Sequence, residues 1–158
     1  AAPVEPREVI KEILDVNFNG VIDTASPLLE RMRSRGRGSV AIISSLSAYH
    51  GTPRFPAYAA SKAALRSYYE AVRGQYARAG VHVSIVCPGF IRTDMTDKLQ
   101  MPGLLLMHVD TAAKKIKQGI DKNKGEISFP WHLRLALASL RLIPARLGDR
   151  LMLLFFRM

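Results

Sequence analysis

Apolar side chains recur at steps of three or four residues from about position 6 to position 34, the spacing of one face of an α-helix. The stripe consists of Ile10, Leu14, Phe18, Val21, Ala25, Leu28 and Met32. Pro27 lies inside this run and should kink the helix, because proline cannot donate a hydrogen bond to the preceding turn. Arginines and glycines at residues 31–38 end the run, as expected near the negative end of a helix dipole.

Three short apolar runs follow, at residues 40–44, 81–87 and 125–129, and each has the length of a strand. The first two are apolar nearly throughout, which is typical of a parallel sheet covered on both faces. Apolar residues recur with helical spacing at residues 57–79, and this predicted helix ends at Gly80. A further helix is predicted at residues 110–122. Alternating helices and strands imply right-handed crossovers. The predicted fold class is therefore α/β, with a doubly wound parallel sheet.

Residues 131–158 are predicted to extend the domain formed by residues 1–130. Apolar runs alternate here with five arginines, and Pro144 divides the stretch into two predicted helices. The arginines are Arg134, Arg141, Arg146, Arg150 and Arg157. A basic amphipathic pair can lie in a membrane interface, with arginines toward the headgroups and leucines toward the acyl chains. It can equally pack against the domain or against a second subunit, so both interpretations stay open.

The charge balance leaves several partners open. The 158 residues include 23 Lys and Arg against 13 Asp and Glu, a formal charge of +10. Such a balance suits nucleic acid, an anionic membrane, an acidic substrate, or a protein whose acidic half lies outside this sequence. No aromatic residues interleave with the basic cluster at 31–37, so we expect no nucleic-acid partner.

The remaining composition narrows the class of protein. The single cysteine, Cys87, excludes an internal disulfide, and the scattered histidines show no metal-ligand spacing. No apolar run has the length of a membrane span. We expect a cytoplasmic protein, with peripheral membrane contact through residues 131–158 as the alternative.

The side chains that could take part in a reaction are concentrated between residues 38 and 62. Ser44 and Ser45 end the first predicted strand, and a Gly/Pro-containing loop leads into the helix that holds Tyr58 and Lys62. Tyr58 and Lys62 are four residues apart, so they share one helix face. A phenol has a pKa near 10 and works as an acid or base only if that value falls. An ammonium one turn away can lower it by favouring the phenolate.

These residues resemble the active site of the short-chain dehydrogenase/reductase family, which has a Rossmann-like fold. Tyr58-Ala-Ala-Ser-Lys62 matches its Tyr-x-x-x-Lys motif, and Ser45 precedes the tyrosine by the family's thirteen residues. The segment Val-Asn-Phe-Asn-Gly containing Asn17 and the segment from Pro88 to Thr93 match two further motifs, so that the resemblance covers about residues 6–129. It implies catalytic roles for Asn17, Ser45, Tyr58 and Lys62, and cofactor binding by Tyr58, Lys62, Pro88, Gly89 and Thr93.

The resemblance also implies roles for these groups. Tyr58 would be the general acid/base, Ser45 would hold the substrate oxygen, and Asn17 would complete a proton relay. The cofactor would be NADP or NAD, with the absence of a side chain on Gly89 allowing a close approach of the backbone. The family places a substrate lid at residues 93–109, where leucine and methionine are frequent. A helix packed on the core fits those residues equally well.

Two motifs of the family do not occur in this sequence, namely its Gly-rich dinucleotide turn and its Asn-Asn-Ala-Gly segment. We therefore expect the carboxyl-terminal part of a longer NAD(P)-dependent oxidoreductase that interconverts an alcohol and a carbonyl on an apolar small molecule. The alternative is a non-catalytic fragment that acts as a dimerising or membrane-surface module. In the family, helices corresponding to residues 6–34 and 57–79 pair across a two-fold axis, which implies a homodimer or homotetramer.

Overall fold

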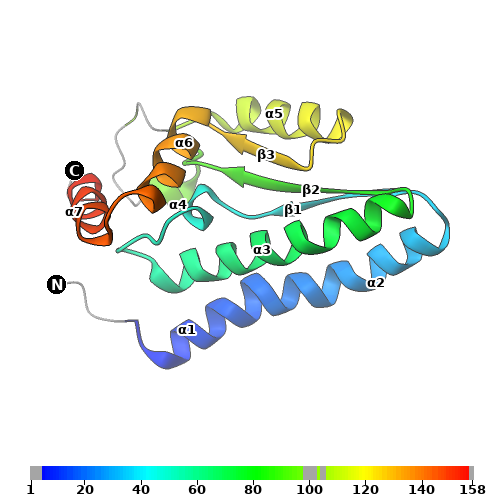
Figure 1. Ribbon diagram of the computed structural model, residues 1–158, viewed down its shortest axis with the longest axis horizontal. Helices are drawn as coiled ribbons and strands as arrows, with labels where there is room; N and C mark the ends of the chain where they lie inside the picture. The colour runs from blue at the N-terminus through cyan, green and yellow to red at the C-terminus, as the bar shows by residue number, and fades with distance from the viewer. Residues whose placement is uncertain (1–4, 98–102, 104–105, 157–158) are drawn as a thin grey trace.

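The computed structural model describes residues 5–97, 103 and 106–156 (Figure 1). Its centre is a parallel sheet of three strands in the order β1-β2-β3. β1 spans Gly38–Ile43, β2 spans Val81–Pro88 and β3 spans Glu126–Phe129. In the register, Ile42 lies beside Ile85, and Ile85 beside Glu126. The predicted α/β class with a parallel sheet is confirmed, and each strand lies within two residues of its predicted bounds.

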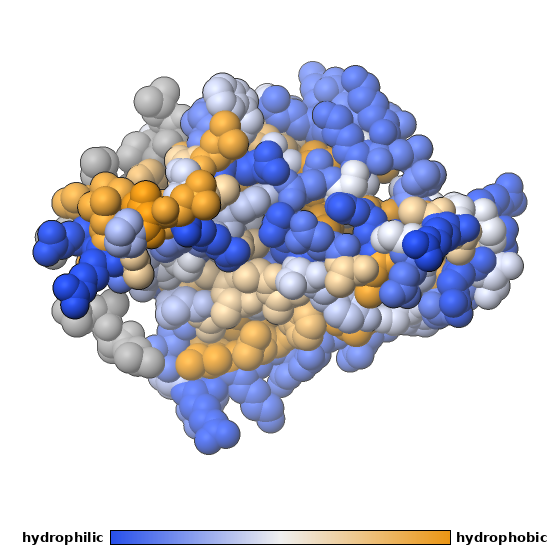
Figure 2. Space-filling model, in the orientation of Figure 1, coloured by the Kyte–Doolittle hydropathy of each residue, from blue (hydrophilic) through white to orange (hydrophobic). Residues whose placement is uncertain are grey.

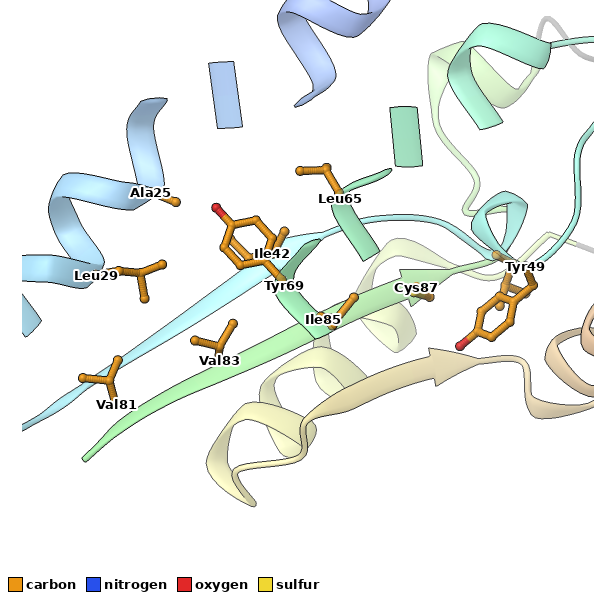
Figure 3. Packing of buried hydrophobic residues seen from close by; sticks show 11 residues of the cluster. Ala25, Leu29, Ile42, Tyr49, Leu65, Tyr69, Val81, Val83, Ile85 and Cys87 are labelled. Atoms are coloured by element: carbon orange, nitrogen blue, oxygen red, sulfur yellow. The ribbon is translucent and has the colours of Figure 1, made fainter. Parts of the chain in front are cut away.

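One face of the sheet is covered by two long helices, α2 (Gly20–Ser34) and α3 (Pro56–Arg78), as Figure 1 shows. Alternate residues of β2 point toward them, because side chains along a strand alternate between faces. Figure 3 shows the resulting cluster, in which the strand residues meet side chains of both helices. Its labelled members are Ala25, Leu29, Ile42, Tyr49, Leu65, Tyr69, Val81, Val83, Ile85 and Cys87.

The other face is covered by α5 (Val109–Asp121). Val86 points to this side, where it packs with Ala112 and Ile127 in a second cluster. Gly119 lets α5 approach β3 closely, since a Cβ there would lie 2.5 Å from the Cδ1 of Ile127. The sheet is therefore buried on both faces, which explains why β1 and β2 are apolar nearly throughout.

The first predicted helix is interrupted, but not by Pro27. α1 (Arg7–Leu14) passes into the π-helical turn η1 (Asp15–Asn19) before α2 begins. At this turn the Gly20 N–H reaches the carbonyl of Asp15, five residues back. α2 then continues through Pro27 as an α-helix. The predicted kink at Pro27 is therefore not the point where the helix departs from α geometry.

Beyond β3 the chain turns back over the carboxyl ends of the strands. α6 (Trp131–Ser139), the short turn η4 (Leu140–Leu142) and α7 (Ala145–Phe155) follow in order, and Pro144 separates the two helices as predicted. Leu133 and Leu137 pack against the main core cluster. None of the described helices combines the length and apolar character needed to cross a bilayer.

The segment predicted as a lid or a core helix, residues 93–109, lies partly outside the described residues, at 98–102 and 104–105. Within it, the short helix α4 (Asp94–Asp97) follows Thr93. Met107 returns to the sheet edge, where its N–H donates to the Phe90 carbonyl at 2.9 Å. Neither interpretation of residues 93–109 is tested.

Candidate active site

The two serines at the end of β1 have different surroundings. Ser44 is buried, and its hydroxyl donates to the Lys62 carbonyl at 2.8 Å, which joins the strand to α3. Ser45 begins the 3-10 turn η2 (Leu46–Ala48), where its Oγ accepts the Ser47 N–H at 3.2 Å. Ser45 also lines a cavity of about 530 Å³, whereas Ser44 is not among the residues that line it. Of these two neighbouring hydroxyls, Ser45 is therefore the one available to a ligand.

Tyr58 lies in the first turn of α3 and lines the same cavity as Ser45. Pro56 at the start of the helix has its backbone angle preset for the first turn. Burial raises the pKa of the Tyr58 phenol, and a hydrogen bond with Ser45 opposes this only in part. The phenol is therefore protonated at neutral pH, the form in which it can donate a proton.

Lys62 lies one turn further along α3. Its Nζ donates to the Ile43 carbonyl at 3.2 Å and is 5.6 Å from the centre of the Tyr58 ring. Burial lowers the pKa of this ammonium. We predicted that Lys62 would lower the pKa of Tyr58, but in this structure the pKa is raised. The physical reason is that burial dominates at Tyr58, while the ammonium faces a carbonyl at the end of β1.

Pro88 ends β2, and Gly89 and Thr93 follow it into the cavity. The Gly89 N–H donates to the Phe129 carbonyl at 2.8 Å. A Cβ on Gly89 would lie 3.0 Å from the ring of Pro130, so packing against the end of β3 favours glycine. Thr93 accepts the Thr96 N–H through its Oγ1 at 3.4 Å. Of the predicted cofactor residues, Tyr58, Gly89 and Thr93 therefore line one cavity.

Asn17 lies at the centre of the π-helical turn η1, which packs against α3. Such turns occur frequently at functional sites, because the inserted residue re-aims its neighbours. Asn17 is half-buried and does not line the cavity. Asn17 and Lys62 thus lie on two elements that contact each other, and neither lines the cavity. The proposed relay role of Asn17 stays a prediction.

The cavity that joins these residues has a volume of about 530 Å³. Its polar side chains come from Ser45, Ser47, Thr52, Tyr58, Thr93 and Thr96. Its opposite wall is apolar and consists of Leu133, Ala136, Leu137, Leu140, Leu151, Met152, Phe155 and Phe156. This wall comes from α6, η4 and α7, together with Phe156 directly after α7. The helical spacing of these residues was visible in the sequence, but it did not indicate which surface they would cover.

Two observations bear on whether a nicotinamide dinucleotide fits here. The Lys62 ammonium has three hydrogens, and the Ile43 carbonyl is its one acceptor among the described residues. The hydroxyl of Ser47 is buried at the cavity and has no hydrogen-bond partner among those residues. Together with the phenol of Tyr58 and the hydroxyl of Thr93, these donors fit the nicotinamide and ribose end of such a cofactor.

A second polar cluster, which the sequence did not reveal, fixes the apolar wall. The Glu126 carboxylate accepts hydrogen bonds from Tyr49 at 2.5 Å and from Ser128 at 3.0 Å. It also pairs with Arg66 of α3 at 3.0 Å and with Arg134 of α6 at 2.9 Å. Arg134 therefore faces inward to the sheet. Unlike an arginine that points to solvent, it is not available to a membrane.

Comparison with known proteins identifies the family. The family model for short chain dehydrogenase matches residues 2–102. An uncharacterized oxidoreductase of Myxococcus xanthus is 33% identical over 144 residues, which cover 91% of this chain and 57% of that protein. The Danio rerio protein dehydrogenase/reductase SDR family member 7B is 36% identical over 88 residues, which cover 56% of this chain and 28% of that protein.

Solved structures show the same fold. A short-chain dehydrogenase from Burkholderia cenocepacia in complex with NADP superposes with a TM-score of 0.80 at 22% identity, over 95% of this chain and 62% of that one. A short-chain dehydrogenase from Streptomyces avermitilis gives a TM-score of 0.71 at 25% identity, over 87% of this chain and 58% of that one. The chain thus spans little more than half the length of these proteins. It belongs to the short-chain dehydrogenase family.

Proposed function

We propose that the protein is an NAD(P)-dependent oxidoreductase that interconverts an alcohol and a carbonyl on an apolar small molecule. The observation that carries this proposal is the cavity of about 530 Å³, where Ser45 and Tyr58 present hydroxyls opposite a wall of leucine and phenylalanine side chains. A ligand that is apolar over most of its surface and has one reactive oxygen matches that distribution.

The proton chemistry belongs to Tyr58 and Ser45. In the reducing direction the phenol donates its proton to the oxygen of the carbonyl group, and in the oxidising direction the phenolate takes it back. The hydroxyl of Ser45 donates a hydrogen bond to the same oxygen and stabilises its developing charge. The raised pKa of Tyr58 keeps the phenol in its acid form, which favours the reducing direction at neutral pH.

The cofactor would be held at its nicotinamide end by Lys62, Thr93 and the backbone at Pro88 and Gly89. When bound, it would supply or accept the hydride. The Lys62 ammonium can donate to ribose hydroxyls with the hydrogens that Ile43 leaves free. Asn17 would link the buried end of Lys62 to solvent. Solved proteins of the same fold were obtained with NADP and with NADPH, which favours NADP for this chain as well.

Self-association is part of the proposal. Val9 on α1 and Val16 on η1 are 40% and 66% exposed, and Leu28 on α2 is 45% exposed. Figure 2 shows a band of apolar residues across the lower part of the molecule, where α1 and α2 lie in Figure 1, with hydrophilic residues below it. A long helix face of this kind suits a second copy of the chain, in a homodimer or a homotetramer.

Replacement of Tyr58 by phenylalanine tests the proposal. The full-length protein is titrated with NADPH and with NADH while nicotinamide fluorescence is followed, and turnover is measured with a panel of apolar ketones. Tyr58→Phe should abolish turnover, because the proton donor is lost. It should leave cofactor affinity nearly unchanged, because Lys62, Thr93 and the backbone at Pro88 and Gly89 still hold the cofactor. Tyr68→Phe removes a hydroxyl from an exposed residue of the same helix and should leave turnover intact. The proposal fails if Tyr58→Phe keeps most of the activity or if neither dinucleotide binds.

A further inference from the structure

The outer side of α6, η4 and α7 is an apolar face bordered by arginines, which we term the tail face. The exposed apolar side chains of these elements are Trp131, Leu135, Leu142, Leu147, Leu151, Leu153 and Leu154, with Leu142 87% and Trp131 69% exposed. In Figure 2 a concentration of apolar residues lies over these helices, with strongly hydrophilic residues at its border. This is a large apolar area for side chains that neither the sheet nor the cavity uses.

The spacing in α7 divides that helix into three faces. Gly148 and Met152 are buried against the protein. Leu147, Leu151 and Leu154 are separated by four and three residues, so they form one exposed stripe beside the buried face. Leu151 is 44% exposed and also lines the cavity, so the outer stripe and the apolar cavity wall are continuous.

The arginines flank the leucine stripe. Arg146 and Arg150 are four residues apart and exposed, and Arg141 is exposed beside Leu142. Asp149 is the only acid among residues 131–156. Arg134 is paired with Glu126, so the outward charge comes from the other three described arginines. An apolar stripe with cations along its border matches the surface of an anionic bilayer.

A second copy of the chain fits this face poorly. In a two-fold symmetric dimer the same patch meets itself, so Arg146 and Arg150 would approach their own copies. Such like-charge contacts are unfavourable.

We propose that the tail face docks on anionic membrane surfaces, with its leucines in the interface and Arg141, Arg146 and Arg150 at the lipid headgroups. The bilayer would then deliver apolar alcohols or ketones to the cavity along the shared Leu151 wall. This last step rests on the proposed function, whereas membrane binding does not.

The experiment is flotation of the full-length protein with vesicles of phosphatidylcholine and phosphatidylserine, compared with vesicles of phosphatidylcholine alone. The protein should float with the mixed vesicles. The double variant Arg146→Gln/Arg150→Gln should lose about 25-fold in partitioning, since each interfacial arginine contributes about fivefold. Leu147→Ser/Leu154→Ser should lose about tenfold or more, because both side chains leave the interface.

The matched control is Arg31→Gln/Arg78→Gln, which removes the same charge at the far ends of α2 and α3 (Figure 1). It should float like the unchanged protein. Equal loss in the control, or no flotation of the unchanged protein, overturns the proposal. So does a change of oligomeric state in the leucine variant without vesicles, which would make the face a subunit interface. Dinucleotide titration of each variant separates these outcomes from a failure of the proposed catalytic site.

Discussion

Replacement of Glu126 by glutamine tests what holds the apolar wall over the cavity. The Glu126 carboxylate joins β3 to Tyr49 after η2, to Arg66 of α3 and to Arg134 of α6. Glutamine has nearly the same size and keeps an oxygen that Tyr49 can use, but it loses the negative charge. Arg66 then keeps only the more exposed carboxylate of Glu70, at 3.4 Å, and Arg134 loses its ion pair, so α6 should lose its main polar attachment to the sheet.

The magnitude follows from the burial of each partner. The side chains of Glu126 and Arg66 are each 20% exposed, whereas that of Arg134 is 43% exposed. Breaking a buried pair costs about 3–5 kcal/mol, and breaking an exposed pair costs about 0–1 kcal/mol. The Arg66 pair lies nearer the first case and the Arg134 pair nearer the second. We expect a loss of about 3 kcal/mol in the free energy of unfolding, or roughly 6–12 °C in Tm.

The assay is urea unfolding of the full-length protein, followed by circular dichroism and by the fluorescence of Trp131 at the start of α6. Glu30→Gln is the matched control, because Glu30 pairs with Arg33 on the surface and is 48% exposed. That variant should lose less than about 1 kcal/mol. If Glu126→Gln is as stable as Glu30→Gln, the carboxylate is not what holds α6 to the sheet.

The stability that the Glu126 carboxylate contributes should depend on pH. Burial alone would raise the pKa of Glu126, but hydrogen bonds from Tyr49, Arg66 and Ser128 and the charge of Arg134 outweigh it, so the pKa is lowered. The stabilisation is therefore complete above the ordinary glutamate pKa of about 4.3 and is lost as the pH falls through the lower folded value. The unchanged protein and Glu126→Gln should converge in stability on acidification, and a constant difference down to about pH 2 would contradict this assignment.

Three further predictions concern single positions. Gly74 lies in open space on α3, so Gly74→Ala should raise the free energy of unfolding, measured with urea, by about 0.5–1 kcal/mol. Gly119→Ala should lower the free energy of unfolding, because the new Cβ would lie 2.5 Å from Ile127. Equal effects of the two substitutions would refute this packing argument. Since burial raises the pKa of Tyr58, the rate of ketone reduction should stay constant up to about pH 9, and a fall between about pH 6 and 8 would contradict this. Cys87 is fully buried and burial raises the pKa of its thiol, so thiol reagents should label it only after unfolding, as mass spectrometry can establish.

The elements and the position of the candidate site were predictable because they depend on local patterns. Apolar runs of strand length and helical spacing fixed the strands and α3 to within two residues. The offsets among Ser45, Tyr58 and Lys62 placed their side chains at one sheet edge, since parallel strands end together there. These signals require only residues that are close in sequence.

The features that sequence did not reveal depend on distant partners. The long helix departs from α geometry at the π-helical turn Asp15–Asn19 and not at Pro27, because hydrogen bonding and packing against α3 decide where such a departure occurs. Glu126 gains its partners from segments up to 77 residues away, which spacing cannot indicate. The pKa of Tyr58 is raised because burial outweighs the hydrogen bond with Ser45, and the extent of burial at a helix start depends on distant segments that spacing cannot indicate.

The paired hydrogen bonds between β1 and α3 have a consequence for ligand recognition. Ser44 donates to the carbonyl of Lys62, and Lys62 donates through its ammonium to the carbonyl of Ile43, so strand end and helix hold each other in both directions. The hydroxyls of Ser45 and Tyr58 are thereby preorganised before any ligand arrives. These two groups therefore lose little conformational entropy when a ligand binds. The apolar wall of α6 and α7 then decides which ligands are preferred.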